Sequence, residues 1–403
     1  MNEKKKILST VSMYHALTDG SVSVIPLLFP IFKQLFQLSY TEVGIITGGG
    51  LCITLIFQLI IGEYGDGKDT GVLLSFGILC TAISLLLLST SRDFFTLVFF
   101  IFVLRFSTSF FHPLGVGWIS RTFKKEGLDW AMGIQSGSAD FGAFLAVLST
   151  LYLTEVFQNW GAPLYIWAGA CFCGLIIGLL AIKDLQQHAL RAPRQKNRTR
   201  GKKQTIREAF QVFKQIKLLA PGFMISGAAW GVTITYLPLL LTEKTTLSLP
   251  IIGMSVAVWI GVGSITSLCY GKIRNRINRK KLIILAYFIL GGMSILLTLS
   301  TQYFLIISAM ILMGISVFLT YPALFSFVSE VTHESVEGRT FGIIFTFQTG
   351  GGTLLIFISG FLADFYGITF PFVLIGCLSL FFATVLLLYR RTTYVHHQIT
   401  NKT

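Results

Sequence analysis

Charged residues are scarce in this sequence. Only 12% of its 403 residues are Asp, Glu, Lys or Arg, whereas 53% are hydrophobic and the mean hydropathy is +0.72. Because a water-soluble domain carries about 25% charged residues, this composition excludes a soluble globular protein. The sequence therefore predicts an integral membrane protein.

Several catalytic and metal-binding signatures are also absent. The chain has no Walker-type phosphate loop, so nothing in it supports direct use of ATP. It has no H-E-x-x-H, no G-x-S-x-G and no cluster of Cys and His, so we expect neither an enzyme nor a bound metal or cofactor. A membrane-bound transferase or a receptor is therefore a less favoured interpretation of this sequence. The six cysteines lie scattered in apolar segments, where we expect buried small hydrophobic residues.

Apolar runs long enough to cross a bilayer recur along the whole chain. A spanning helix needs about 20 apolar residues, and the sequence contains twelve such runs, six in each half. They lie at 9–32, 42–62, 72–90, 95–119, 130–154, 162–182, 218–241, 250–270, 282–300, 303–328, 340–363 and 369–389. We expect an all-α integral membrane protein built from two six-helix bundles.

A constant offset of 209 residues relates the two halves. It superimposes Gly44 on Gly253, Gly62 on Gly271, Asp66 on Asn275, Pro113 on Pro322, Gly133 on Gly342 and Gly142 on Gly351. One offset without gaps over about 100 residues indicates a duplicated unit, a construction common in membrane transporters.

The predicted domain organisation follows from this duplication. We expect an N-terminal bundle over 1–183, a basic linker over 184–215, a C-terminal bundle over 216–389 and a tail over 390–403. The linker is polar and shows no sustained apolar period, and its positive charge favours contact with anionic lipid headgroups. The N-terminal lysines run into a first helix that we expect to be retained.

The positive charge of the chain is distributed very unevenly. Of the 32 lysines and arginines, 28 fall in the termini and in alternate loops that include the linker, and three fall in the opposite loops. By the positive-inside rule, this bias predicts that both termini are cytoplasmic. The net charge of +14 is thus a topology signal, and we expect a lipid bilayer and no nucleic acid as partner.

Two loops at the predicted cytoplasmic side carry related motifs. The loop after 250–270 contains Gly271, Asn275, Arg276, Arg279 and Lys280, and the loop after 42–62 contains Gly62 and Asp66. With two six-helix halves and a basic central loop, these residues resemble the major facilitator superfamily, which carries a Gly, Asp and Arg motif in both loops. The resemblance implies that the two loops form a gate at the cytoplasmic side.

Two further segments are typical of one branch of this superfamily. Phe111, His112 and Pro113 lie within an apolar run, and the span 130–154 contains the small-residue segment GIQSGSADFGAF. Both are similar to segments of the fosmidomycin-resistance branch of the superfamily. This resemblance implies a monomeric secondary transporter in the cell inner membrane, with a cavity lined by the first, fourth, seventh and tenth helices.

Only one half of the chain carries ionisable residues inside its spans. These are His15, Asp19, Arg105, His112 and Asp140, and the offset pairs them with the uncharged Met224, Ala228, Gly314, Tyr321 and Thr349. Ionisable residues within a bilayer are costly and are functional candidates by default. Because the second half forms the same helices without them, we predict that they form a substrate and proton-coupling site.

The depth of these residues along their spans predicts two layers. Asp19, Arg105 and Asp140 each lie about ten residues from one end of their span, near the middle of the membrane. His15 and His112 lie closer to the cytoplasm, where imidazole could relay a proton because it titrates near neutral pH. From the C-terminal half we expect Trp230, Tyr236, Tyr321 and Gln348 to line the cavity.

A polar wall facing an aromatic wall fits a small amphipathic or anionic molecule. We therefore predict secondary transport by alternating access, with efflux driven by proton antiport. The alternative is proton-coupled uptake of a small nutrient such as an organic acid, an amino acid or a siderophore. The sequence leaves open whether sodium replaces the proton.

Overall fold

The structure is a computed structural model that describes residues 3–65, 67–123, 125–183, 185, 190, 217–331 and 337–389. Its regular elements in these ranges are all helices, and twelve of its helical segments are long and apolar enough to cross a membrane. The expected all-α architecture with twelve spans is therefore confirmed. The linker, apart from residues 185 and 190, and the tail lie outside the described residues.

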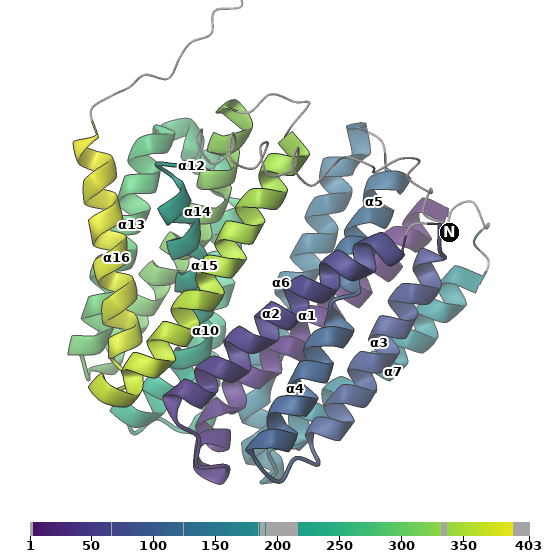
Figure 1. Ribbon diagram of the computed structural model, residues 1–403, viewed down its shortest axis with the longest axis horizontal. Coiled ribbons are helices and arrows are strands. Elements are labelled where there is room, and N and C mark those ends of the chain that lie inside the picture. Colours follow the sequence, from purple (N-terminus) through teal and green to yellow (C-terminus); the bar gives the residue numbers. More distant parts are fainter. Residues whose placement is uncertain are drawn as a thin grey trace, which may run out of the picture.

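Figure 1 shows two bundles that lie side by side, with the N-terminal half in purple and blue and the C-terminal half in green and yellow. The N-terminal bundle consists of α1 (Glu3–Leu35), α2 (Tyr40–Tyr64), α3 (Thr70–Leu88), α4 (Phe94–Thr108), the π-helix η1 (His112–Val116), α5 (Gly117–Thr122), α6 (Lys125–Phe157) and α7 (Ala162–Lys183). The C-terminal bundle consists of α10 (Ala220–Lys244), α11 (Leu249–Leu268), α12 (Tyr270–Arg276), α13 (Arg279–Leu299), α14 (Tyr303–Val331), α15 (Glu337–Tyr366) and α16 (Phe370–Leu388).

Short polar residues start several of the spans. Before α2, Ser39 and Glu42 form a capping box in which each side chain accepts a hydrogen bond from the backbone N–H of the other. Asp69 and Asp93 accept hydrogen bonds from the first turns of α3 and α4. These caps satisfy backbone donors that a helix leaves free at its start, so each apolar run becomes a helix with a defined beginning.

The fourth span is interrupted, whereas the sequence predicted one helix over 95–119. Helix α4 ends at Thr108, η1 begins at His112, and α5 completes the segment to Thr122. Pro113 has no N–H to donate to the preceding turn, which disrupts the regular α-helical pattern. Nearby, the hydroxyls of Thr108 and Ser109 donate to the carbonyl oxygen of Arg105 at 3.1 and 2.8 Å. The break places His112 at the first position of the π-helix.

Glycines related by the 209-residue offset serve the same packing role in both bundles. Gly142 of α6 lies directly against the backbone of Ala16 in α1, so a Cβ there would overlap it. Its counterpart Gly351 of α15 lies close against the side chain and Cα atom of Met224 in α10, so a Cβ there would overlap as well. Small residues let membrane helices approach closely, so α1 packs on α6 and α10 packs on α15 at matching points.

The expectation that all six cysteines are buried is wrong. Cys171 is buried and Cys80 is partly buried, whereas Cys52, Cys173, Cys269 and Cys377 are exposed. In a membrane protein the outer surface of a helix is apolar as well, so an apolar sequence around a residue does not imply burial.

The close approach of α1 and α6 predicts a large effect of bulk at Gly142. We expect Gly142→Val to lower the free energy of unfolding by about 1–3 kcal/mol or more, because overpacking forces the helices apart. The matched control is Gly137→Val on the same helix, where an added Cβ meets nothing within 4 Å. Thermal unfolding of the purified variants in detergent measures both. Equal stability of the two variants would contradict the assigned packing.

Candidate functional site

The two bundles cross at two places related by the duplication. At the first crossing, Gly44 and Gly48 of α2 lie against Ile356, Phe357 and Gly360 of α15. At the second, Gly253 and Gly261 of α11 lie against Phe144, Val147 and Leu151 of α6. Apart from Gly261, which lies near the middle of α11, the contacting residues belong to the portions of the four helices nearer the predicted external side.

Toward the other end, glycines of α6 and α15 have open space beside them. A Cβ added at Gly133 or Gly137 of α6, or at Gly350 of α15, would meet nothing within 4 Å. These glycines lie beyond the crossings, on the portions of α6 and α15 nearer the predicted cytoplasmic side. We infer that the bundles are separated toward that side.

Within the described residues, Gly62 and Gly271 of the two loops expected to gate that side make no close contact across the halves. The nearest atom to a Cβ added at Gly62 belongs to Pro113 of the same half, at 3.5 Å, and a Cβ added at Gly271 meets nothing within 4 Å. Asn275 and Arg276 are exposed. Lys280 donates to the backbone oxygen of Tyr389 at 2.8 Å within the C-terminal half, Arg279 begins α13 and is partly buried, and Asp66 lies outside the described residues.

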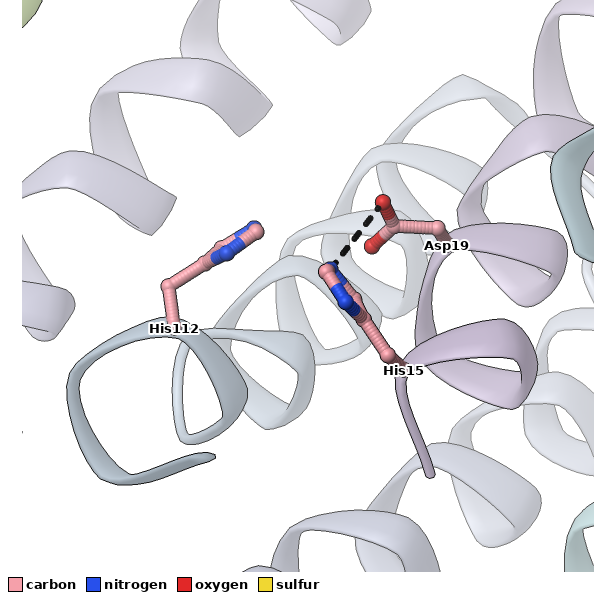
Figure 2. Close-up of side chains that lie close together, drawn as sticks. All are labelled: His15, Asp19 and His112. Atoms are coloured by element: carbon pink, nitrogen blue, oxygen red, sulfur yellow. Dashed lines mark ion pairs between the residues drawn. The ribbon is translucent and has the colours of Figure 1, made fainter. Parts of the chain in front are cut away.

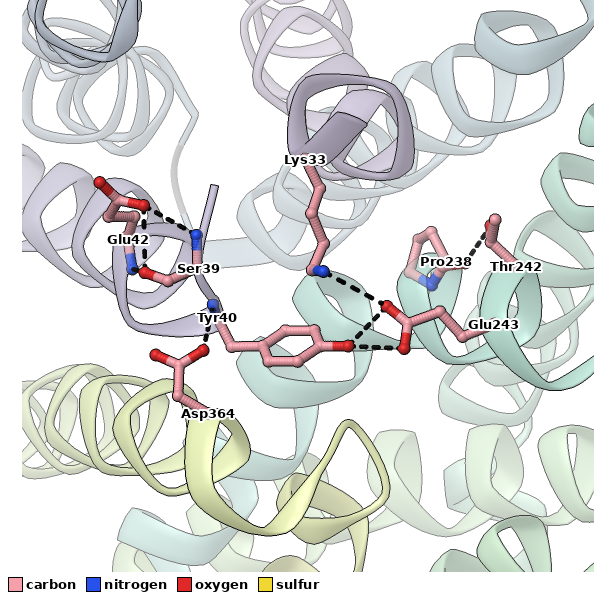
Figure 3. Close-up of polar contacts among 8 residues, drawn as sticks. All are labelled: Lys33, Ser39, Tyr40, Glu42, Pro238, Thr242, Glu243 and Asp364. Carbon is pink, nitrogen blue, oxygen red and sulfur yellow. Dashed lines mark hydrogen bonds and ion pairs between the residues drawn. The ribbon is translucent and has the colours of Figure 1, made fainter. Parts of the chain in front are cut away.

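Polar side chains hold the opposite end together, as Figure 3 shows. Asp364 of α15 accepts hydrogen bonds from the backbone N–H groups of Tyr40 and Thr41 at 2.7 and 2.9 Å, and from the hydroxyl of Thr41 at 2.5 Å. A carboxylate at the amino end of a helix satisfies free donors and interacts favourably with the helix dipole. In this case the capping carboxylate comes from the other bundle.

A second contact extends this connection. The Tyr40 hydroxyl donates to both carboxylate oxygens of Glu243 at 2.5 and 2.6 Å, and the ammonium group of Lys33 lies 3.8 Å from Glu243. We call Lys33, Tyr40, Glu243 and Asp364 the external latch. We did not predict this latch from the sequence, although acidic residues at predicted external helix ends, beside a capping box at Ser39, were a usable signal.

Three of the five predicted site residues lie together in the N-terminal bundle (Figure 2). The Nε2 atom of His15 lies 3.6 Å from an Asp19 carboxylate oxygen, and the rings of His15 and His112 meet edge to face with centroids 5.3 Å apart. Phe111 stacks on the His15 ring at 4.0 Å. His15 is buried, Asp19 is partly exposed and His112 is exposed.

The protonation pattern of His15 can be assigned from its neighbours. Its Nδ1 atom lies 2.9 Å from the carbonyl oxygen of Gln135, which only accepts hydrogen bonds, so Nδ1 carries a hydrogen. In the neutral ring Nε2 is then an acceptor, and this buried atom has no hydrogen-bond partner among the described residues. It faces a carboxylate, which is also an acceptor. Such a pair is satisfied by a cation or a proton between the two atoms, and His15, Asp19 and His112 together could hold a metal ion.

Arg105 and Asp140 lie near this group without joining it. Asp19 is within electrostatic range of both, but no ion pair between Arg105 and either carboxylate forms among the described residues. The Arg105 side chain packs on Gly50 of α2, and its Nε atom is buried without a described hydrogen-bond partner. The predicted central layer is therefore looser than a set of direct ion pairs.

Asp140 faces the C-terminal bundle. It lies one and two helical turns before Phe144 and Val147, whose contacts with α11 form the second crossing. Asp140 therefore shares their face of α6, on the side where the bundles are separated, and it is exposed. Its carboxyl group has no ion pair among the described residues.

The four predicted cavity residues of the C-terminal half differ in burial and in position. Tyr236 is fully buried at the first crossing, where its hydroxyl donates to the carbonyl oxygen of Ile356 at 3.1 Å, so in this conformation it belongs to the closed end. Trp230 and Tyr321 are partly buried. Gln348 is buried, and its side-chain oxygen has no hydrogen-bond partner among the described residues.

Comparisons with known proteins agree with this architecture. A sequence model described as Major Facilitator Superfamily matches residues 11–356 and 219–402. The "Uncharacterized MFS-type transporter YfnC" of Bacillus subtilis (strain 168) is 27% identical over 158 residues, which are 39% of this chain and 38% of that protein. The chain thus matches well under half of that relative's length.

Two solved structures illustrate the similarity of fold. The nucleoside transporter NupG has a TM-score of 0.77, with 13% identity over 96% of this chain and 98% of that chain. A bacterial homolog of the human lysosomal transporter Spinster, in an inward-facing and occupied conformation, has a TM-score of 0.79, with 13% identity over 96% of this chain and 97% of that chain. At such identities the likeness shows the fold alone.

The external latch predicts a conformational effect of Asp364→Ala. Losing the cap on α2 destabilises the closed end by about 1–2 kcal/mol, roughly a 5- to 30-fold shift in the equilibrium between conformations. A cysteine introduced by Gly137→Cys can be labelled with an impermeant maleimide from the predicted cytoplasmic side. Its labelling, measured above that of the parent chain, should fall accordingly when Asp364→Ala is added.

The control for this experiment is Glu155→Ala. The offset pairs Glu155 with Asp364, and Glu155 is exposed at the end of α6. We expect it to leave labelling at residue 137 unchanged. Unaltered labelling in Asp364→Ala would show that the latch does not hold this conformation.

Proposed function

Because the chain belongs to the Major Facilitator Superfamily, and is a membrane transporter rather than an enzyme, we propose that it carries a small amphipathic compound by alternating access. In this proposal the bundles of residues 1–183 and 216–389 rock about a central site, joined by the cytoplasmic linker 184–215 and followed by the tail 390–403. The protein acts as a monomer in the cell inner membrane, and both termini are cytoplasmic.

The chemistry of the N-terminal bundle supports a polar recognition site. Arg105 carries a positive charge with a buried Nε atom that lacks a described partner, and guanidinium groups favour carboxylate and phosphate groups. The partly buried Trp230 and the exposed Phe345 supply apolar surface from the other half. A molecule with one polar and one apolar end fits both surfaces.

We assign the coupling proton to Asp140. Its carboxyl group is exposed on the face of α6 turned toward the other bundle, without a described ion pair. When the site is enclosed, a charged carboxylate there is costly, whereas a carboxylate neutralised by a proton or by a substrate group is tolerated. Asp140 can thereby link proton binding to movement of the bundles.

The direction of transport depends on the charge of the substrate. Asp19, Asp140 and Arg105 together carry one more negative than positive charge, which favours a substrate with a cationic or hydrogen-donating group near Asp140. Such a group competes with the proton, so antiport and efflux follow. An anion at Arg105 would instead bind together with a proton, since protonating a nearby carboxylate removes repulsion. That alternative gives symport and uptake of a nutrient.

Growth of cells exposed to a panel of cationic and anionic amphipathic compounds tests the proposal. We expect protection by the parent chain that Asp140→Asn loses, because losing a charge-assisted contact weakens binding by about 10- to 100-fold. Glu155→Gln on the same helix is the matched control and should keep protection.

The same cells distinguish the alternatives. Sensitisation by the parent chain, with accumulation of the compound, would indicate uptake. Protection that survives both Asp140→Asn and Arg105→Ala would contradict the assignment of the site to the N-terminal bundle.

A further inference from the structure

We propose that His15, Asp19 and His112 form a binding site for a divalent transition-metal ion. From the sequence we expected no metal, because it contains no H-E-x-x-H motif and no cluster of Cys and His. This inference goes beyond the proposed function, since it rests on the geometry of three side chains and holds for either direction of transport.

The donor set selects the class of ion. Two imidazole nitrogens and one carboxylate oxygen suit Zn²⁺, Co²⁺, Ni²⁺, Mn²⁺ and Fe²⁺. Mg²⁺ and Ca²⁺ prefer sites built from oxygen ligands alone. The site is therefore assigned to the transition-metal class.

The distances fit this class of ion. Two ligands held about 2.0–2.2 Å from a tetrahedral metal lie about 3.3–3.6 Å apart, and His15 Nε2 lies 3.6 Å from the Asp19 oxygen. All three potential donor atoms lie within 4.8 Å of one another. His112 needs to approach by about 1 Å to complete the set. Its exposed side chain at the start of η1 has room to do so.

The surroundings of His15 resemble the outer shell of a metal ligand. A ligating histidine usually donates its other N–H to a carbonyl or carboxylate, which fixes the ring. Here Nδ1 meets the Gln135 carbonyl oxygen at 2.9 Å, and Phe111 stacks on the ring face. Nε2 is thereby directed at Asp19, with His112 on the neighbouring helix beside it, as Figure 2 shows, and it is buried without a described hydrogen-bond partner.

The third donor distinguishes a metal site from a simple hydrogen bond. A hydrogen bond between His15 and Asp19 would satisfy those two residues and leave His112 without a role. The two imidazole rings lie 5.3 Å apart, and the donor atoms of His15, Asp19 and His112 lie within 4.8 Å of one another, so His112 places a second nitrogen near the pair. Arg105 opposes a cation here, and Asp140 offsets that charge, since both lie within electrostatic range of Asp19.

The ion reaches this site from the side where the bundles are separated. Asp19 is partly exposed, with 34% of its side chain accessible, and His112 is exposed. Three protein ligands leave coordination positions open for water or for a donor group of a carried compound.

Co²⁺ titration of the purified full-length protein tests the proposal. The protein is produced with an affinity tag that lacks histidine, freed of metal with a chelator, and followed by the visible absorption of bound Co²⁺ and by calorimetry. We expect one ion per chain, displaced by Zn²⁺ and not by Mg²⁺. His112→Asn should weaken binding at least about 100-fold, since loss of an outer-shell partner alone costs about 10- to 100-fold.

The controls separate this site from adventitious binding. The double variant His396→Asn/His397→Asn removes an adjacent histidine pair in the tail and should bind Co²⁺ as the parent does. His112 is exposed, so His112→Asn should keep the parent's thermal stability, and His15→Asn and Asp19→Asn provide second and third tests at the same site.

The proposal is overturned by a parent chain that binds no Co²⁺. It is equally overturned by binding that the tail variant loses and His112→Asn retains. Neither result bears on transport, because the titration uses no substrate and no gradient. Failure of the metal site and failure of the proposed function are therefore distinguishable.

Discussion

The contact between Asp364 and the amino end of α2 is the interaction on which the rest of this conformation depends. It caps a helix of one bundle with a carboxylate of the other, and with Tyr40, Glu243 and Lys33 it ties the bundles together at one end. The glycine crossings extend from this end to about the middle of the helices. Because contact between the bundles is concentrated there, Asp140 of α6, which lies beyond the second crossing, is exposed.

The two duplicated halves share the glycines used for packing but not the ionisable residues. Gly142 and Gly351 allow the same close approach in both bundles, and Gly44 and Gly253 lie at the two crossings. Packing of this kind is needed twice, so both halves carry it. The charged residues are needed once, and only the N-terminal half places His15, Asp19, Arg105, His112 and Asp140 within its spans. The two halves therefore have similar folds but differ in chemistry, since these ionisable residues lie in the N-terminal half.

The sequence predicts the twelve spans closely, because each is set by the length of an apolar run and by polar caps such as Ser39 and Asp69. It misses the interruption before His112, where Pro113 and nearby hydroxyls favour a π-helix over the regular pattern. The positions of His15 and His112 along their helices predict a similar depth in the membrane. They do not predict which side chains of neighbouring helices meet. The hydrogen bond from His15 to the Gln135 carbonyl oxygen, the packing of Arg105 on Gly50 and the burial of Tyr236 all depend on how helices meet. The contact between Tyr40 and Asp364 could not be predicted for the same reason. It joins helices of different bundles, and the hydropathy of a span does not indicate which other spans it contacts.

In the proposed mechanism, Asp140 faces the space between the bundles and binds a proton there. Carbodiimides add to protonated carboxyl groups, so treatment with a hydrophobic carbodiimide followed by mass spectrometry measures this protonation. We expect Asp140 to be modified and Asp364, held by three hydrogen bonds in the latch, to be spared. Modification of the exposed Glu155 on the same helix without modification of Asp140 would contradict it.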